Sequence, residues 1–213
     1  MRTLLLASLL VSAPAAAQET PLIGEYRLSE GPDAAGGLLI GADGRFQYGL
    51  AVGALDERAE GRWEPRGDQV CLFTEPKPVP PAFEKGPLIE VEGKVPTLLV
   101  TGPDDDGVPG IDFVIGFDSG APAKGYTQYY GWSMPEEDKR IPRWVEVGEP
   151  MYGLALRRFD LTESDGGRLR IAIIPNDMGI VDFNGACVEK TQDGVILHRA
   201  EGDMRFAPLR ELE

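Results

Sequence analysis

Apolar and polar residues alternate along residues 38–73 in short segments separated by turn residues. Phe46, Tyr48 and Leu50 alternate with polar or small residues, which is the period of a strand with one buried face. Asp43-Gly44 comes just before, and both residue types accept the positive φ angles that hairpin turns use. We therefore predict an antiparallel meander with strands near 23–28, 38–40, 45–50, 57–63 and 69–74.

The alternation returns after residue 88 and continues to the end of the chain. Turn residues such as Asp193-Gly194 separate its segments, and no stretch has convincing helical periodicity. Strands at intervals of about ten residues are typical of a sandwich or a barrel. The main predicted strands are 88–91, 97–101, 112–117, 125–132, 152–161, 167–174, 180–188, 195–199 and 204–208.

Prolines interrupt the pattern between these two regions, at Pro76, Pro78, Pro80, Pro81 and Pro87. Proline lacks the N–H that a central strand or helix interior needs, so residues 76–87 are predicted to be a stiff connector. The predicted fold is all-β, with an N-terminal antiparallel meander or partial barrel at 18–75. An antiparallel β-sandwich or barrel is predicted at 88–213.

Several short motifs in the first region are mainly turn glycines and packed aromatic residues. They are Gly24-Glu25-Tyr26, Leu38–Ile40, Asp43-Gly44-Arg45-Phe46, Gly61-Arg62-Trp63 and Val70-Cys71-Leu72. Residues 22–74 thereby resemble the lipocalin-like half-barrels of bacterial envelope proteins, including the N-terminal domain of NlpE-like copper-resistance lipoproteins. The resemblance implies the fold alone. The chain lacks both a cysteine directly after the leader and a CxxC pair, so lipid anchoring and thiol-based copper sensing do not carry over.

The first 17 residues have the three regions of a secretory signal peptide: Arg2, an apolar run from Leu4 to Val11, and a cleavage site at Ala15-Ala16-Ala17. The run is too short to span a bilayer. We expect a mature chain that begins at Gln18 and is periplasmic or secreted. The alternative is a buried N-terminal helix.

The mature chain would hold 20 basic and 35 acidic side chains, a formal charge of −15. Such a surface repels nucleic acid and anionic lipid, so we expect neither nucleic-acid binding nor membrane insertion. The sequence contains neither a P-loop nor a dinucleotide fingerprint, and no cofactor is predicted.

Two segments are candidate binding sites. Asp104 and Asp106, with Asp112 beyond them, offer oxygen ligands to calcium, although the spacing is not that of the twelve-residue calcium loop. The alternative is an exposed acidic turn. Tyr129 and Trp144 are candidates for stacking on a sugar or lining an apolar site, whereas strand periodicity assigns Tyr126, Tyr130 and Trp132 to the core.

No catalytic set is recognisable around His198, the only histidine, and none of the serines lies in a nucleophile motif. The preferred hypothesis is a non-catalytic binding or interaction protein of the bacterial envelope. Its partner would be a small apolar molecule, a glycan or another envelope protein. The alternative is a secreted glycan-active hydrolase that uses paired carboxylates near Tyr129 and Trp144.

Cys71 and Cys187 are the only cysteines, and export would place them in an oxidising compartment, so we predict a disulfide between them. Val70 and Leu72 share one face of their strand, which leaves Cys71 and Phe73 on the other. Phe183 has the same parity as Cys187, so Phe73 and Phe183 are expected near a contact between the two halves. The link would stabilise the fold by about 4–5 kcal/mol in the loop-entropy model. The alternative is two buried free thiols.

Overall fold

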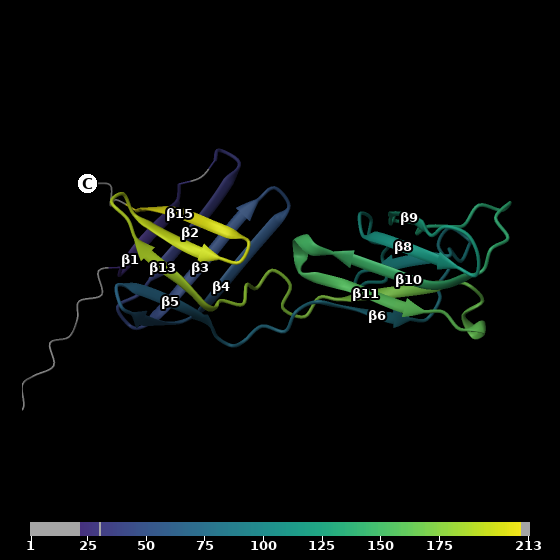
Figure 1. The fold of residues 1–213 in the computed structure, drawn as a ribbon, viewed down its shortest axis with the longest axis horizontal. Coiled ribbons are helices and arrows are strands. Elements are labelled where there is room, and N and C mark those ends of the chain that lie inside the picture. Colours follow the sequence, from purple (N-terminus) through teal and green to yellow (C-terminus); the bar gives the residue numbers. More distant parts are fainter. Residues whose placement is uncertain (1–21, 30, 210–213) are drawn as a thin grey trace, which may run out of the picture.

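The computed structural model describes residues 22–29 and 31–209, and the predicted signal peptide at 1–17 lies outside these ranges. The described chain is all-β, as predicted, and forms two units joined by a narrow connection (Figure 1). One unit is a closed barrel built from both ends of the described chain, and the other is inserted between its strands. Within the described ranges, no helix has the length and apolar content that a membrane span requires.

The barrel has eight antiparallel strands in the order β1-β15-β14-β13-β5-β4-β3-β2. Apart from the insertion, they follow one another around the barrel in chain order, which is an up-and-down topology. Their bounds are β1 Gly24–Leu28, β2 Ala34–Ile40, β3 Arg45–Val52, β4 Leu55–Arg66, β5 Gln69–Thr74, β13 Asn184–Lys190, β14 Val195–Arg199 and β15 Gly202–Pro208.

Alternate side chains of the barrel strands fill its interior. Phe46 and Tyr48 of β3 are buried, whereas Arg45 and Gln47 between them are exposed, as the sequence pattern predicted. The Phe183 ring lies between them, with centroid distances of 5.9 Å to Phe46 and 5.0 Å to Tyr48. An eight-stranded barrel is just wide enough for side chains to fill, so these rings form a packed core.

The inserted unit consists of two sheets packed face to face. One has the order β11-β10-β8-β9 and the other β6-β12-β7. Apolar side chains such as Ile115 and Val145 of the first sheet share a core with Leu169 and Ile171 of the second. The bounds are β6 Ala82–Gly86, β7 Leu98–Thr101, β8 Asp112–Phe117, β9 Ala123–Tyr126, β10 Pro142–Glu149, β11 Leu154–Asp160 and β12 Leu169–Ile174, with short 3-10 turns at η1 Pro150–Tyr152 and η2 Glu163–Asp165.

The prediction of a wholly antiparallel second segment is wrong for one pair of strands, because β7 and β12 are parallel. All four residues of β7 are buried. Continuous burial of this kind is typical of parallel strands, which are covered on both faces.

The two chain segments that connect the units lie side by side. The Val79 amide donates to Asp177 Oδ2 at 2.8 Å, the Asp177 amide donates to Val79 O at 3.1 Å, and Asn176 Nδ2 donates to Pro80 O at 2.9 Å. Immediately beyond them, Ala82 of β6 pairs with Ile174 of β12. The insertion therefore starts and ends at one place, which allows a folded unit to sit inside the barrel sequence.

The domain boundaries differ from those predicted. The connector predicted at 76–87 contains the strand β6. The prolines of the connector lie before and after this strand rather than within it. Residues 184–208, predicted to belong to the second unit at 88–213, form three strands of the barrel instead. Alternation identified these segments as strands, but it carries no information on which sheet they join.

The predicted disulfide is confirmed, and it joins neighbouring barrel strands rather than separate units. Cys71 of β5 lies directly opposite Cys187 of β13, with Cα atoms 4.0 Å apart. Because these strands flank the insertion, the bond ties the barrel together at the point where the chain leaves it and returns.

The expectation that Phe73 and Phe183 lie together at a contact between the two halves is wrong, because the two side chains are on opposite faces of the barrel wall. The β5–β13 register shifts between Asn184 and Ala186, where Gly185 has a φ of 90°. An extra residue in one strand reverses which parity faces inward. Phe183 therefore enters the barrel core, while Phe73 stays partly exposed beside the Arg62 guanidinium.

We predict that removing the disulfide with Cys71→Ala/Cys187→Ala lowers the free energy of unfolding by about 4–5 kcal/mol. The bond acts on the unfolded chain, in which it closes a loop with a sequence separation of 116 residues and so removes conformational entropy. Urea unfolding with and without reductant measures the difference. Reductant should leave the double variant unchanged, and equal stability of the variant and the oxidised parent protein would contradict the prediction.

Candidate functional site

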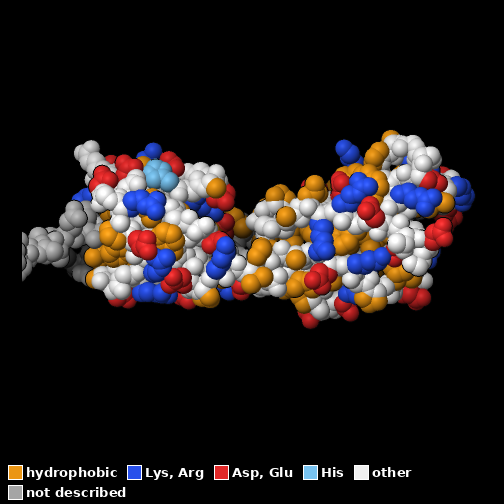
Figure 2. Space-filling model, turned by 60° about the horizontal axis from the view of Figure 1, so that its bottom comes forward, with side chains coloured by type: hydrophobic (Ala, Val, Ile, Leu, Met, Phe, Trp, Pro, Cys, Tyr) orange, Lys and Arg blue, Asp and Glu red, His pale blue; other side chains and the backbone are white. Residues whose placement is uncertain are grey.

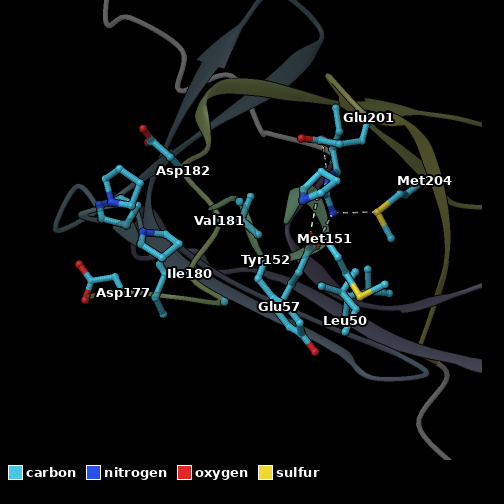
Figure 3. Close-up of a pocket in the computed structure, with 18 of the residues that line it drawn as sticks. Leu50, Glu57, Met151, Tyr152, Asp177, Ile180, Val181, Asp182, Glu201 and Met204 are labelled. Carbon is cyan, nitrogen blue, oxygen red and sulfur yellow. Dashed lines mark hydrogen bonds and ion pairs between the residues drawn. The ribbon is translucent and has the colours of Figure 1, made fainter. Parts of the chain in front are cut away.

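A pocket of about 940 Å³ opens at the end of the barrel that faces the inserted unit (Figure 3). We call it the mouth pocket. It is lined by the facing ends of β3 and β4, the β14–β15 hairpin, both connecting segments and the η1 turn of the inserted unit. Both units thus contribute walls. Its main apolar lining residues are Leu50, Leu55, Met151, Ile180, Val181 and Met204.

The position of the mouth pocket follows from the alternation in β3. Phe46 and Tyr48 face into the packed core, and Leu50 is the next inward position toward the inserted unit. In Figure 3, Met151 and Tyr152 lie next to Leu50 and Glu57, whereas Asp177 and Asp182 lie on the opposite side. Figure 2 shows apolar side chains gathered on the inserted unit beside the narrowing between the units.

A hydrogen bond from Tyr152 Oη to Ala54 O at 2.6 Å holds the η1 turn against the barrel. Glu149 caps this turn by accepting from the Tyr152 amide at 2.8 Å, and Gly153 ends it in the left-handed region. The turn thereby presents Met151, which is 56% exposed, to the mouth pocket.

A buried ion pair lies at the base of the mouth pocket. Arg199 donates to both carboxylate oxygens of Glu57, at 2.6 and 3.1 Å, and to Tyr48 Oη at 2.6 Å. Tyr48 Oη in turn donates to Glu57 at 3.0 Å. The Arg199 and Glu57 side chains are only 7% and 16% exposed. The inward positions of Glu57 and Arg199 near the barrel mouth are therefore polar, whereas the inward positions deeper in the barrel are apolar.

Burial determines the protonation of this network. It raises the pKa of the Tyr48 hydroxyl well above its usual value, so Tyr48 stays neutral and can donate to Glu57. Burial disfavours the Arg199 charge, but hydrogen bonds to Glu57 and the charges around it outweigh this cost and raise the pKa of Arg199. Both carboxylate oxygens of Glu57 therefore accept hydrogen bonds from a charged Arg199.

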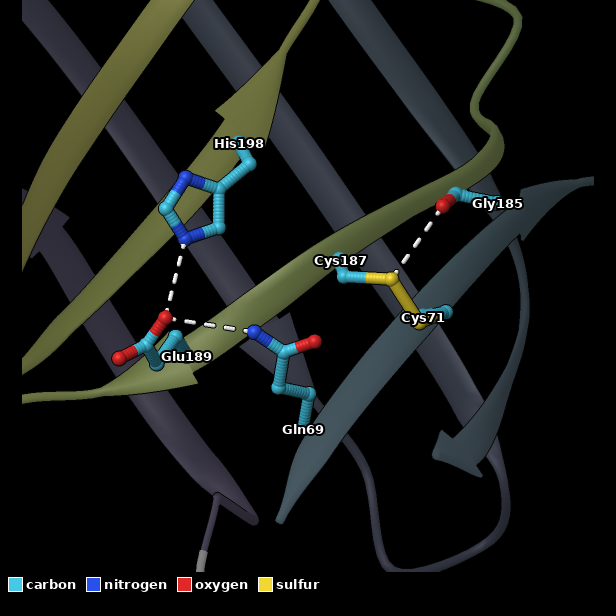
Figure 4. The surroundings of a disulfide bond; sticks show 6 residues. All are labelled: Gln69, Cys71, Gly185, Cys187, Glu189 and His198. Atoms are coloured by element: carbon cyan, nitrogen blue, oxygen red, sulfur yellow. Dashed lines mark hydrogen bonds and ion pairs between the residues drawn. A yellow bond between two sulfur atoms is a disulfide. The ribbon is translucent and has the colours of Figure 1, made fainter. Parts of the chain in front are cut away.

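His198 lies on the outer surface of the barrel near the disulfide (Figure 4). Its Nδ1 is 2.8 Å from Asp203 Oδ1, and its Nε2 is 3.3 Å from Glu189 Oε2. Gln69 Nε2 donates to the same Glu189 oxygen at 3.3 Å. The hydrogen bond with Asp203, helped by Glu189, raises the pKa of His198 above its usual value. The His198 side chain thus points out of the barrel, as strand periodicity predicted.

The predicted aromatic residues Tyr129 and Trp144 do not line the mouth pocket. Tyr129 is 69% exposed, as expected, in the turn that follows β9. Trp144 lies over Gly116, where a Cβ atom would come within 2.0 Å of the indole ring, and Arg158 stacks on it at 4.2 Å. Arg158 also forms ion pairs with Glu146 and Asp160, so these carboxylates are paired.

The prediction that Tyr126 and Tyr130 fill the core is wrong, because both are largely exposed. The predicted strand 125–132 ends at Tyr126, where Thr127 turns the chain. Thr127 Oγ1 donates to Val108 O at 2.6 Å and accepts from the Ile111 amide at 3.1 Å. These side-chain hydrogen bonds replace the ladder that would have continued the strand.

The candidate calcium ligands Asp104, Asp106 and Asp112 are not brought together. Across residues 22–29 and 31–209, no group of three or more histidine, cysteine or acidic residues is arranged to hold a metal ion. Within the acidic loop, Asp105 instead pairs with the buried Arg170. Asp104 and Asp106 are exposed in this loop.

Sequence reasoning missed the residues that form the mouth pocket. A signal was present in β14, where Arg199 continues the inward parity of Val195 and Leu197. A charged residue at an inward position of a barrel strand needs a buried partner. The sequence does not reveal that the partner is Glu57, because the two residues are 142 positions apart.

The chain was compared with protein-family models, curated proteins and solved structures, and none of the three comparisons gave a match.

We predict that Arg199→Met lowers the free energy of unfolding by about 3 kcal/mol, because it leaves the Glu57 carboxylate without its partner. The double variant Glu57→Leu/Arg199→Met should recover more than half of this loss, since an apolar pair of similar volume removes both charges. Urea unfolding of the two single variants and the double variant measures the coupling. Additive losses would contradict the assignment of a buried, mutually dependent pair.

We also predict that His198 stabilises the barrel at low pH. A pKa raised by folding means that its contribution is fully present below the usual value near 6.5 and disappears as the pH rises through the higher folded value. The difference in free energy of unfolding between the parent protein and His198→Gln should stay below about 1 kcal/mol, since the group is exposed. It should be larger at pH 5.5 than at pH 8.5, by denaturant titration. A difference that does not change with pH would refute this.

Proposed function

We propose that this protein is a non-catalytic exported binding protein of the bacterial envelope that takes a small apolar ligand in the mouth pocket. The observation that carries the proposal is the pocket itself, at about 940 Å³, with apolar side chains from two separate units around a polar base. Ligand sites are commonly cavities of roughly 300–1,000 Å³ between domains or in the mouths of β-barrels. They are mostly apolar, with a few polar groups that orient the ligand.

The position of the pocket supports a site at the barrel mouth rather than deep inside the barrel. Phe46, Tyr48 and Phe183 fill the interior, so a ligand would bind at the opening, against Leu50 and Met151. Because Met151 comes from the inserted unit, that unit would serve as one wall of the site.

The hydrogen bonding of the polar groups supports a non-catalytic role. A general base must be free to take a proton from a substrate. Glu57 instead receives hydrogen bonds from Arg199 on both oxygens, and His198 lies outside the barrel between two carboxylates. The hydrolase alternative needs paired carboxylates beside Trp144, but Glu146 and Asp160 there are held by Arg158.

Export and the lipocalin-like relationship are parts of this proposal. The leader pattern at 1–17 supports export, and the Cys71–Cys187 bond is compatible with an oxidising compartment. The up-and-down barrel topology is one that lipocalins also have, which supports the resemblance in residues 22–74.

The proposal predicts saturable binding of the uncharged fluorescent probe N-phenyl-1-naphthylamine, whose emission rises in an apolar site. Met151→Gln should weaken binding roughly fivefold, because about 1 kcal/mol of apolar contact is lost. Leu156→Gln is the matched control, since Leu156 is also exposed on the inserted unit but does not line the mouth pocket. Absence of saturable binding, or equal effects of the two variants, would contradict the proposal.

A further inference from the structure

The mouth pocket carries an excess of negative charge. Five carboxylates and two basic side chains line it, which leaves a formal charge of −3. At its base the charges of Glu57 and Arg199 offset each other through hydrogen bonds. The excess therefore lies around the opening, on Asp177, Asp182, Glu201 and Asp203. Lys77, the other basic lining residue, offsets one of these four charges.

The negative charge and the apolar surface are on different sides of the pocket. Figure 3 places Asp177 and Asp182 on one side, opposite Met151 and Met204. A molecule that covers the methionines would thus extend toward the two aspartates. Low-dielectric walls focus the field of such charges into the cavity and favour a positive group there.

Asp182 has the most available carboxylate of this group. It is held only by Lys77, at 3.8 Å, among the residues that the structure describes, and the Lys77 side chain is 76% exposed. The others have closer partners: Asp177 accepts from the Val79 amide, Glu201 from Arg199 Nε and Asp203 lies against the His198 ring. An exposed lysine at this distance gives up its place at little cost, because surface ion pairs are weak.

We infer that the mouth pocket selects amphiphiles with an apolar body and one cationic group, and that Asp182 receives the cationic group. This inference rests on the proposed function and specifies the chemical class of its ligand. The apolar body would lie against Leu50, Met151 and Met204, and the cation would displace Lys77 from Asp182.

The test compares three ligands that share a twelve-carbon chain and differ in head group: dodecyltrimethylammonium, dodecanol and dodecanoate. Each is titrated below its aggregation concentration against the protein loaded with N-phenyl-1-naphthylamine, and probe displacement gives the affinity. We expect the cation to bind more tightly than the alcohol, and the alcohol more tightly than the anion. Added salt should narrow these differences.

Variants locate the effect in the pocket. Asp182→Asn should weaken the binding of dodecyltrimethylammonium roughly fivefold and leave the binding of dodecanol unchanged. A factor of roughly five corresponds to the attraction between two unit charges at contact distance in a medium as polar as water. Lys77→Gln should strengthen binding of the cation. Asp104→Asn is the matched control, because it removes the same charge from a loop outside the mouth pocket and should change none of the affinities.

The outcomes separate this inference from the proposed function. Displacement by all three ligands with equal affinity would overturn the charge preference and leave apolar binding standing. Equal weakening by Asp182→Asn and Asp104→Asn would show that overall charge, not Asp182, attracts the cation. Displacement by none of the three ligands would count against the inference and the proposed function together.

Discussion

The pairing of β5 with β13 is the constraint on which the rest of the structure depends. It joins two segments separated by the whole inserted unit, and without it the eight barrel strands could not close. The cross-strand bond between Cys71 and Cys187 holds this pairing covalently, and the bulge at Gly185 turns Phe183 into the barrel core. Closure of the barrel, filling of its interior and attachment of the insertion thus all depend on one ladder.

The same constraint accounts for the mouth pocket. Because the chain leaves and re-enters the barrel at neighbouring strands, the inserted unit stays close to one end of the barrel. Hydrogen bonds between the connecting segments, together with the Tyr152–Ala54 contact, place the η1 turn over that end. Barrel residues such as Leu50 and Glu57 then share a cavity with Met151, although neither unit alone would enclose it.

Local features of the chain could be predicted from the sequence, because they depend on neighbouring residues. Alternation identified Phe46 and Tyr48 as inward-facing. The disulfide could be predicted because the sequence contains only two cysteines. Features that depend on distant parts of the chain could not be predicted in this way. Residues 184–208 were recognised as strands but assigned to the wrong unit, since periodicity does not identify a neighbouring strand.

The candidate site was the less predictable part for a related reason. Tyr129 and Trp144 stood out as aromatic residues, yet the residues that form the mouth pocket are ordinary ones gathered from six regions of the chain. Arg199 was a local anomaly, as a charge in an inward position. Its significance depends on Glu57, which only the closed barrel brings within reach.

The central claim is that the barrel and the inserted unit together enclose one ligand site. Hydrogen–deuterium exchange with and without dodecyltrimethylammonium tests it most directly, because protection can be followed in each unit separately. The account predicts slower exchange on ligand binding both in the barrel at residues 50–57 and in the inserted unit at 150–153. Protection confined to one of these segments, or found instead around Trp144 of β10, would contradict it.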